Sequence, residues 1–227
     1  MNRAEVKARV EEVGIIPAVR VSSEHIARFA AEAVASGGIP IVEIEMTVPG
    51  AIDVISYLIE HTPEMIVGAG SIYDTETARR CIAAGAKFLT TDGLDLEIIE
   101  FANKEDICVW PAALTPTEVI TAWKAEPDFV KVFPCAPVGG ENYIRILKKA
   151  LAHIPLIAAG GVNQQTAQRF IVAGAVALGV GGDLIPEDAL RLKQAARIRE
   201  LAQRFVRFVK DGRGQLAALR KRSLSFQ

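Results

Sequence analysis

The feature that most constrains this chain is a regular alternation between short apolar runs and longer amphipathic segments. The runs are rich in Val, Ile, Leu and Ala and are bounded by Gly, Pro or polar residues, as is typical of strands buried on both faces. Eight of them recur about every 20–27 residues, at positions 15–19, 39–44, 65–67, 87–89, 107–109, 129–132, 156–158 and 176–180. Strands of this kind need helices on both faces, so the pattern predicts a parallel sheet covered by helices.

Each apolar run is followed by a segment with helical periodicity, and several of these segments end at glycine. Gly37, Gly85 and Gly174 stand just past a predicted helix, where glycine adopts the left-handed conformation of a C-cap without steric cost. Eight strand–helix units in 227 residues predict an α/β fold, a closed (β/α)8 TIM barrel that forms a single domain over residues 1–227. A doubly wound open sheet is the alternative, but no GxGxxG turn follows the first predicted strand.

The two ends of the chain fall outside the eight units. A helix over residues 3–12 is predicted to cap the N-terminal end of the barrel, and a longer helix is predicted over about residues 189–210. From about residue 211 we expect a basic, solvated tail, residues 211–227. It contains Arg220, Lys221 and Arg222, a run of charge too short to mark an interaction site.

Composition excludes several classes of protein. Charged residues make up 23% of the chain and the formal net charge is -1, which argues against a disordered chain and against a nucleic-acid partner. No apolar run approaches the roughly 20 residues of a membrane span. The three cysteines are far apart with no CxxC pair, and the N-terminus is charged rather than a signal peptide. We therefore expect a cytoplasmic protein with no membrane partner.

Lys131 has the sharpest chemical implication of any residue in the sequence. It lies within the segment DFVKVFP, residues 128–134, an apolar run in which a long cation is out of place. A buried ammonium loses hydration, which favours the neutral amine, and a neutral amine can attack a carbonyl to form a Schiff base. The alternative is a lysine whose amine extends from the strand end to solvent.

Glu43 and Glu45 lie in the second apolar run and share one face of the strand, because side chains alternate with period two. Two carboxylates that face the interior of a barrel repel each other, so one of them tends to hold a proton. This arrangement favours general acid–base catalysis. A salt bridge to Arg20 or Lys131 is the alternative, and it does not exclude catalysis.

Other polar residues stand at the carboxyl ends of the predicted strands, where the active site of such a barrel lies. They are Arg20, Thr47, Ser71, Asp92 and Thr115. The three histidines, at positions 25, 61 and 153, fall in helices or at loop starts, so neither a metal site nor a Ser–His catalytic pair is predicted.

Two glycine pairs follow the last two strands. Gly160 and Gly161 come after the seventh strand, and Gly181 and Gly182 come after the eighth. Barrels often bind phosphate on the backbone N–H groups of these two loops. The pairs therefore indicate a phosphate site, with ordinary tight turns as the alternative.

Five short motifs occur in order, each at its own strand end. They are Val-Glu-Ile at 42–44, Gly-Ala-Gly-Ser at 68–71, Lys-Val-Phe-Pro at 131–134, Gly-Gly-Val at 160–162 and Gly-Gly at 181–182. Each is weak alone, but the ordered set resembles the class I 2-keto-3-deoxy-6-phosphogluconate (KDPG) and 4-hydroxy-2-oxoglutarate (KHG) aldolases over roughly residues 5–210.

The resemblance implies a homotrimeric barrel that uses no cofactor and no metal. Lys131 matches the Schiff-base lysine of the family, and Glu43 matches its general acid–base. Ser71 matches the hydroxyl residue that helps to hold the carboxylate of pyruvate, and Phe133 matches an aromatic residue beside the lysine. The two glycine pairs match the loops that bind phosphate.

The chain also departs from the family pattern. Thr47 stands where the KDPG enzymes carry an arginine, and Arg20 matches an arginine of the related phosphogalactonate aldolases. We therefore expect Arg20, with Ser71 and Thr47, to hold the substrate carboxylate. Asp92 stands where many members have proline, and its charge would weaken anion binding unless it pairs with Arg20.

The resemblance implies a Schiff-base aldolase that cleaves KDPG-type sugar acids or 4-hydroxy-2-oxoglutarate. The products would be pyruvate and an aldehyde, either glyceraldehyde 3-phosphate or glyoxylate. A 2-dehydro-3-deoxy-6-phosphogalactonate aldolase is the nearest alternative. A phosphosugar isomerase or epimerase, and a binding protein without turnover, remain open on the same barrel.

Overall fold

The strands of the computed structural model form a closed parallel barrel. The model describes the backbone of residues 1–224, with all side chains except those of residues 220 and 222–224. In this range the strands are β1 Ile15–Val19, β2 Ile41–Glu45, β3 Ile66–Gly70, β4 Phe88–Thr90, β5 Cys108–Trp110, β6 Ala112–Ala113, β7 Val130–Val132, β8 Leu156–Ala159 and β9 Ala177–Val180. Their order is β5-β4-β3-β2-β1-β9-β8-β7-β6, so β1 joins the first half of the chain to the last strand. The predicted (β/α)8 fold is confirmed.

The fifth predicted strand differs from the structure. The sequence pattern predicts it over residues 107–109, but two short strands, β5 and β6, stand on either side of Pro111. Proline has no N–H to donate, so the regular hydrogen-bond ladder stops at it. β5 pairs with β4, and β6 pairs with β7, so the interrupted strand still completes the ring.

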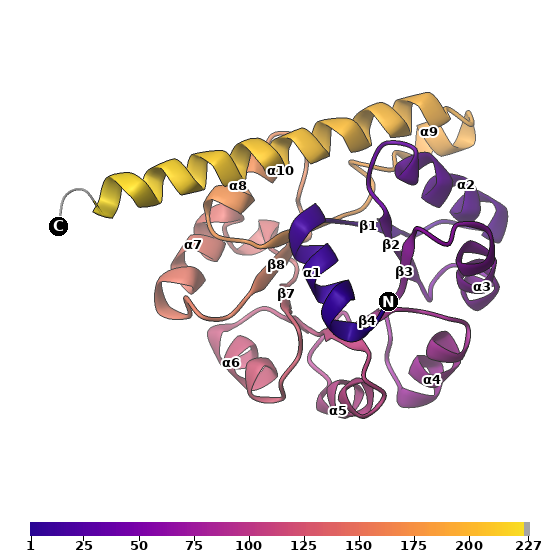
Figure 1. Ribbon diagram of the computed structural model, residues 1–227, viewed down its shortest axis with the longest axis horizontal. Helices are drawn as coiled ribbons and strands as arrows, with labels where there is room; N and C mark the ends of the chain where they lie inside the picture. The colour runs from indigo at the N-terminus through magenta and orange to yellow at the C-terminus, as the bar shows by residue number, and fades with distance from the viewer. Residues whose placement is uncertain (225–227) are drawn as a thin grey trace.

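Helices surround the barrel, as Figure 1 shows. Their bounds are α1 Arg3–Val13, α2 Glu24–Ala35, α3 Ala51–His61, α4 Thr75–Ala83, α5 Leu96–Lys104, α6 Pro116–Lys124, α7 Glu141–Ala150, α8 Ala167–Val172, α9 Glu187–Arg191 and α10 Ala195–Leu224, with a short 3-10 helix over Ala136–Val138. Local sequence sets several of their ends. The side chains of Asp74 and Asp95 cap the first turns of α4 and α5, and Gly14 ends α1 in the left-handed conformation.

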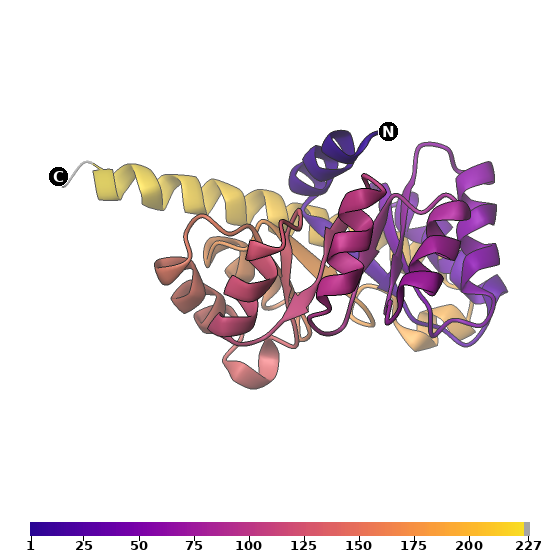
Figure 2. The same cartoon turned by 90° about the horizontal axis from the view of Figure 1, so that it is seen from below.

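The barrel interior is filled from its N-terminal end by apolar side chains. Phe88 stacks on Trp110 with ring centroids 4.3 Å apart, and Trp110 meets Phe129 edge to face. Val6 and Val10 of α1 pack against the same cluster, so α1 closes this end of the barrel (Figures 1 and 2). The predicted N-terminal capping helix is confirmed.

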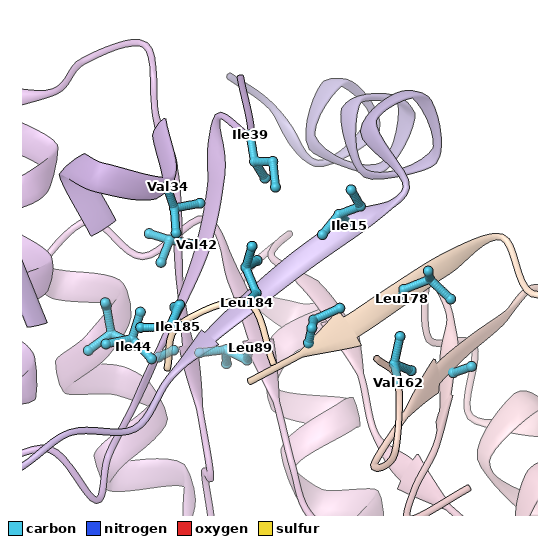
Figure 3. Close-up of a cluster of buried hydrophobic side chains, with 14 of the residues drawn as sticks. Ile15, Val34, Ile39, Val42, Ile44, Leu89, Val162, Leu178, Leu184 and Ile185 are labelled. Atoms are coloured by element: carbon cyan, nitrogen blue, oxygen red, sulfur yellow. The ribbon is translucent and has the colours of Figure 1, made fainter. Parts of the chain in front are cut away.

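A second, larger apolar cluster lies between the outer face of the strands and the helices. Part of it is drawn in Figure 3, where Ile15, Val42 and Leu178 from three strands lie with Leu184 and Ile185 from the loop after β9. These side chains are buried, so the two clusters hold most of the strands from both faces. The strand ends that carry polar residues are therefore fixed in place.

The C-terminal part of the prediction is wrong in two respects. The single helix predicted over about residues 189–210 is divided into α9 and α10, and the expected tail from about residue 211 is helical up to Leu224. Gln, Leu, Ala, Arg and Lys, all strong helix formers, dominate residues 215–222, so α10 continues past the barrel (Figure 1). Within residues 1–224, no helix is long and apolar enough to span a membrane.

We expect Gly68→Ala to destabilise the barrel. A methyl group at Gly68 would meet three atoms of the Phe88 ring at 2.1–2.3 Å, inside the packed interior. Overpacking of this kind costs roughly 1–3 kcal/mol of unfolding free energy, measurable by urea denaturation. Gly93→Ala is the control, because no atom lies within 4 Å of the added methyl. Equal urea midpoints for Gly68→Ala and wild type would contradict the tight packing.

Candidate active site

A cavity of about 390 Å³ opens at the carboxyl ends of the strands. Six charged side chains from different strands and loops line it: Arg20, Glu43, Glu45, Asp92, Lys131 and Asp183. The apolar cluster of the barrel interior, which contains Phe88, Trp110 and Phe129, lies beneath the strand ends that carry these groups. The cavity therefore has an apolar base and a charged wall. Electrostatic interactions in such surroundings are stronger than in water.

Lys131 stands in the middle of β7 and points into the barrel. It is 6% exposed, so its side chain does not extend to solvent. Its Nζ donates to Thr90 Oγ1 at 2.8 Å and lies 3.4 Å from Asp92 Oδ1. The Phe133 ring lies on another side, with its centroid 5.5 Å from Nζ. The amine is thus held at the cavity wall by two groups from the end of β4.

Glu43 lies in the middle of β2, and its register pairs it with Ala18 of β1 and Gly68 of β3. Burial raises the pKa of Glu43, and the nearby charge of Lys131 and a hydrogen bond from Thr90 only partly oppose this. Thr90 Oγ1 donates to Glu43 Oε1 at 3.2 Å. Glu43 can therefore hold or accept a proton closer to neutral pH than an exposed carboxyl.

Thr90 is a site residue that the sequence analysis missed. Its hydroxyl accepts from Lys131 and donates to Glu43, and all three side chains are buried. A signal was present, because Thr90 is two residues beyond Phe88 and so faces the barrel interior. The strand was predicted over residues 87–89, so Thr90, the last residue of β4, fell just outside it.

Arg20 and Glu45 form an ion pair across the rim of the cavity. Arg20 Nε lies 2.5 Å from Glu45 Oε2. The hydrogen bond to Glu45 raises the pKa of Arg20, against an opposing effect of burial. The sequence left open a salt bridge from Glu43 or Glu45 to Arg20 or Lys131. In the structure Glu45 makes this bridge, with Arg20. Arg20 lines the cavity, but with a carboxylate already bound to it.

Asp92 is bound by neutral hydroxyls and by the amine, not by Arg20. Ser71 Oγ lies 2.7 Å from Asp92 Oδ2, the Tyr73 hydroxyl lies 2.9 Å from the same oxygen, and Lys131 reaches Oδ1. Burial by itself would raise the pKa of Asp92, but these bonds together hold it below its usual value. Asp92 is therefore an anion beside the amine.

The two glycine pairs line the same cavity as the carboxylates. Gly160 and Gly161 have φ values of 75° and 97°, which favour glycine. A methyl group on Gly161 would lie 2.2 Å from Ala136 Cβ, so this loop needs glycine for space as well. Gly181 and Gly182 have no such close neighbours.

Three of the residues expected at the site, Ser71, Thr47 and Thr115, are not among those that line the cavity. Ser71 is buried and bound to Asp92. Thr47 is exposed in the loop between β2 and α3. Thr115 is exposed too, and its side chain caps α6 in a capping box with Glu118. The structure thus places Thr115 in a helix cap. Among the described residues, no hydrogen bond or ion pair joins Thr47 to the other expected site residues.

The described residues contain no group of three or more His, Cys, Asp or Glu placed to hold a metal ion. All three cysteines are buried, and burial raises the pKa of the Cys135 thiol to about 11. The amine, the carboxylates and the hydroxyls described above are the reactive groups that the chain itself places at this cavity.

Comparison with known proteins agrees with this geometry. The family model described as KDPG and KHG aldolase matches residues 6–201. The chain belongs to this family. Its relatives include the KHG/KDPG aldolase of Escherichia coli strain K12, which is 26% identical over 85% of this chain and 90% of that protein. The 2-dehydro-3-deoxy-6-phosphogalactonate aldolase of the same strain is 28% identical over 78% of this chain and 84% of that protein.

A solved structure described as native KDPGal has the same fold. It superposes with a TM-score of 0.80 at 26% identity, and the match covers 87% of this chain and 95% of that one. The predicted membership of the KDPG/KHG aldolase family is confirmed, and the chain is an aldolase, a lyase that acts on a carbon–carbon bond.

We expect Gly70→Ala to reduce aldolase turnover while the protein stays folded. The added methyl would lie 2.1 Å from Glu43 Oε1, so the carboxylate has to move away from Thr90. Displacement of a catalytic group by about 1 Å costs on the order of a hundredfold in rate. Steady-state kinetics would measure this, with circular dichroism to check folding and Gly93→Ala as the active control. Full turnover in Gly70→Ala would show that the position of Glu43 is not critical.

Proposed function

We propose that this aldolase works through a Schiff base on Lys131. It would cleave 4-hydroxy-2-oxo acids of the KDPG and KHG type to pyruvate and an aldehyde. The observation that carries the proposal is the hydrogen-bonded series from Lys131 Nζ through Thr90 Oγ1 to Glu43 Oε1. It places a buried amine and a proton-accepting carboxylate at one cavity wall. The KDPG and KHG substrates rank ahead of phosphogalactonate because the matching family model carries their names.

The first step needs a neutral amine. A proton on the Lys131 ammonium can pass to Thr90 Oγ1 while the hydroxyl proton passes to Glu43, which leaves a free amine and a protonated carboxyl. The amine then attacks the C2 carbonyl of the substrate to give a carbinolamine. The protonated Glu43 can return its proton to the departing hydroxyl, so that water leaves and an iminium forms.

The second step breaks the carbon–carbon bond. Glu43, now a carboxylate, takes the proton of the C4 hydroxyl, either directly or through a water molecule. The C3–C4 bond breaks, the aldehyde leaves, and the bonding electrons move into the iminium to form an enamine. Glu43 then donates its proton to C3, which becomes the methyl group of pyruvate. Hydrolysis of the imine releases pyruvate and regenerates the Lys131 amine.

Asp92 supports this chemistry by stabilising positive charge on the nitrogen. Its Oδ1 lies 3.4 Å from Lys131 Nζ, so it favours both the resting ammonium and the later iminium. The raised pKa of Glu43 fits its double role, because a group is most effective in proton transfer when its pKa lies near the working pH. Asp92 thus stabilises positive charge, and Glu43 transfers protons.

Assembly and location stay predictions. The resemblance implies a homotrimer, which sedimentation of the purified protein would test. The cytoplasmic location rests on the three cysteines, which are far apart with no CxxC pair.

Borohydride reduction in the presence of pyruvate tests the proposed function directly. We expect a stable adduct on Lys131, located by peptide mass spectrometry, because borohydride reduces the imine to a secondary amine. Lys131→Ala should give no adduct and less than about a hundredth of the wild-type turnover, since no amine then remains at this wall. A folded wild-type protein that gives no adduct would point instead to an isomerase or to a binding protein without turnover.

Thr90→Val is expected to slow imine formation roughly a hundredfold, because valine keeps the shape of threonine but cannot pass a proton. Thr90→Ser restores the hydroxyl and should recover most of the rate. Rapid-quench trapping with pyruvate and borohydride measures this step apart from carbon–carbon cleavage. A wild-type trapping rate in Thr90→Val would remove Thr90 from the proton path and leave the Lys131 assignment standing.

A further inference from the structure

Asp92 is held through one carboxylate oxygen and faces the amine with the other. Ser71 Oγ donates to Asp92 Oδ2 at 2.7 Å, and the Tyr73 hydroxyl donates to the same oxygen at 2.9 Å. The second oxygen, Oδ1, lies 3.4 Å from Lys131 Nζ. A carboxylate is planar, so two donors on one oxygen also restrict where the other oxygen points. The two hydroxyls therefore keep Oδ1 directed at the Lys131 nitrogen.

Ser71 alone is an incomplete support for Asp92. Its hydroxyl has one proton, and its Oγ lies within hydrogen-bond distance of a second acceptor, Glu45 Oε2, at 3.2 Å. The Tyr73 hydroxyl brings a further proton to Asp92 Oδ2. The hydrogen bond to Asp92 raises the pKa of Tyr73, so the phenol keeps its proton and remains a donor. Tyr73 therefore supplies the hydrogen bond that Ser71 can give to only one of the two carboxylates.

The loop after β3 fixes both hydroxyls in place. Ser71 is 2% exposed and has a φ of 56°, a left-handed conformation that is unfavourable for residues other than glycine. Ile72 is fully buried, and its N–H donates to the carbonyl of Thr90 at 3.1 Å. The loop is therefore tied to the end of β4, two residues before Asp92.

The position of Tyr73 has no explanation in the core or in the cavity lining. Its side chain is 66% exposed, and it is not among the residues that line the cavity. We propose that Tyr73 is a positioning residue of the aldolase: together with Ser71 it holds Asp92 against the Lys131 nitrogen and so speeds the formation of the iminium there. The inference rests on the proposed function, because it needs an imine on Lys131.

The step that Asp92 assists is the loss of water from the carbinolamine. The carbinolamine nitrogen is neutral, and it becomes positive as its lone pair forms the C=N bond and the hydroxyl leaves as water with the proton from Glu43. A carboxylate that is already in place stabilises this developing charge without first having to move. Without the Tyr73 hydrogen bond, Asp92 is free to turn toward the open cavity, which slows the step. Weaker pairing of the resting ammonium would have the opposite effect, because it makes the neutral amine more abundant.

The test is rapid-quench trapping of Tyr73→Phe with pyruvate and borohydride. We expect the rate constant of imine formation at saturating pyruvate to fall about tenfold, because the variant loses one hydrogen bond to a charged group. The half-saturating pyruvate concentration and the final amount of adduct should stay within twofold of wild type. A partly unfolded preparation would instead lower the amount of adduct and leave the rate constant unchanged. A rate constant within twofold of wild type, or above it, overturns the inference.

Two further variants assign the effect to the contact with Asp92. Asp92→Ala should slow trapping at least as much as Tyr73→Phe, and the double variant should be no slower than Asp92→Ala alone, because Tyr73 acts through Asp92. Tyr57→Phe is the matched control: it removes a tyrosine hydroxyl from α3, away from the cavity lining, and should trap at the wild-type rate. A further tenfold loss in the double variant, wild-type trapping in Asp92→Ala, or equal slowing in Tyr57→Phe overturns the inference.

The same trapping experiment separates the two proposals. An adduct on Lys131 of the wild-type protein together with an unchanged rate constant in Tyr73→Phe means that the inference about Tyr73 fails while the proposed function stands. The lack of an adduct on the folded wild-type protein means that the proposed function fails, and the inference fails with it.

Discussion

The structure of the site depends on one hydrogen bond, from Lys131 Nζ to Thr90 Oγ1 at 2.8 Å. An ammonium buried in an apolar barrel has lost its water and is costly unless other groups replace the lost hydrogen bonds. Thr90 replaces one of them and passes the interaction on to Glu43, while Asp92 supplies the opposite charge. The two groups proposed to react are therefore positioned by the same bonds that make their burial tolerable.

The layered interior of the barrel explains why the charges can collect at one end. Phe88, Trp110 and Phe129 fill the space below, and α1 covers them with Val6 and Val10. This apolar layer separates the charged groups of the cavity from the N-terminal end of the barrel. The glycines of β3 make this packing possible. Gly68 leaves room for the Phe88 ring, and Gly70 leaves room for the Glu43 carboxylate.

Sequence periodicity was enough to predict the barrel and the shared face of Glu43 and Glu45. For Lys131 it left burial and extension to solvent open, and the structure shows that Lys131 is buried. It could not predict which carboxylate would bind Arg20, because that choice depends on how two loops approach each other in space. The partner is Glu45, whereas Asp92 takes its hydrogen bonds from Ser71, Tyr73 and Lys131. The sequence did carry signals for two features that were not predicted. Pro111 has no N–H, which accounts for the strand break, and strong helix formers beyond residue 211 account for the longer helix.

The electrostatics of the cavity assign different tasks to its two sides. On the strand side each charge has a partner, so the pairs can stabilise a nitrogen whose charge changes during reaction without attracting further ions. On the loop side, the cavity is lined by the Gly160–Gly161 and Gly181–Gly182 pairs. Glycine leaves the backbone N–H groups uncovered by side chains, so this side can bind the far end of a substrate without a charged side chain of its own. Substrate choice can therefore change on the loop side while Lys131, Thr90 and Glu43 stay as they are.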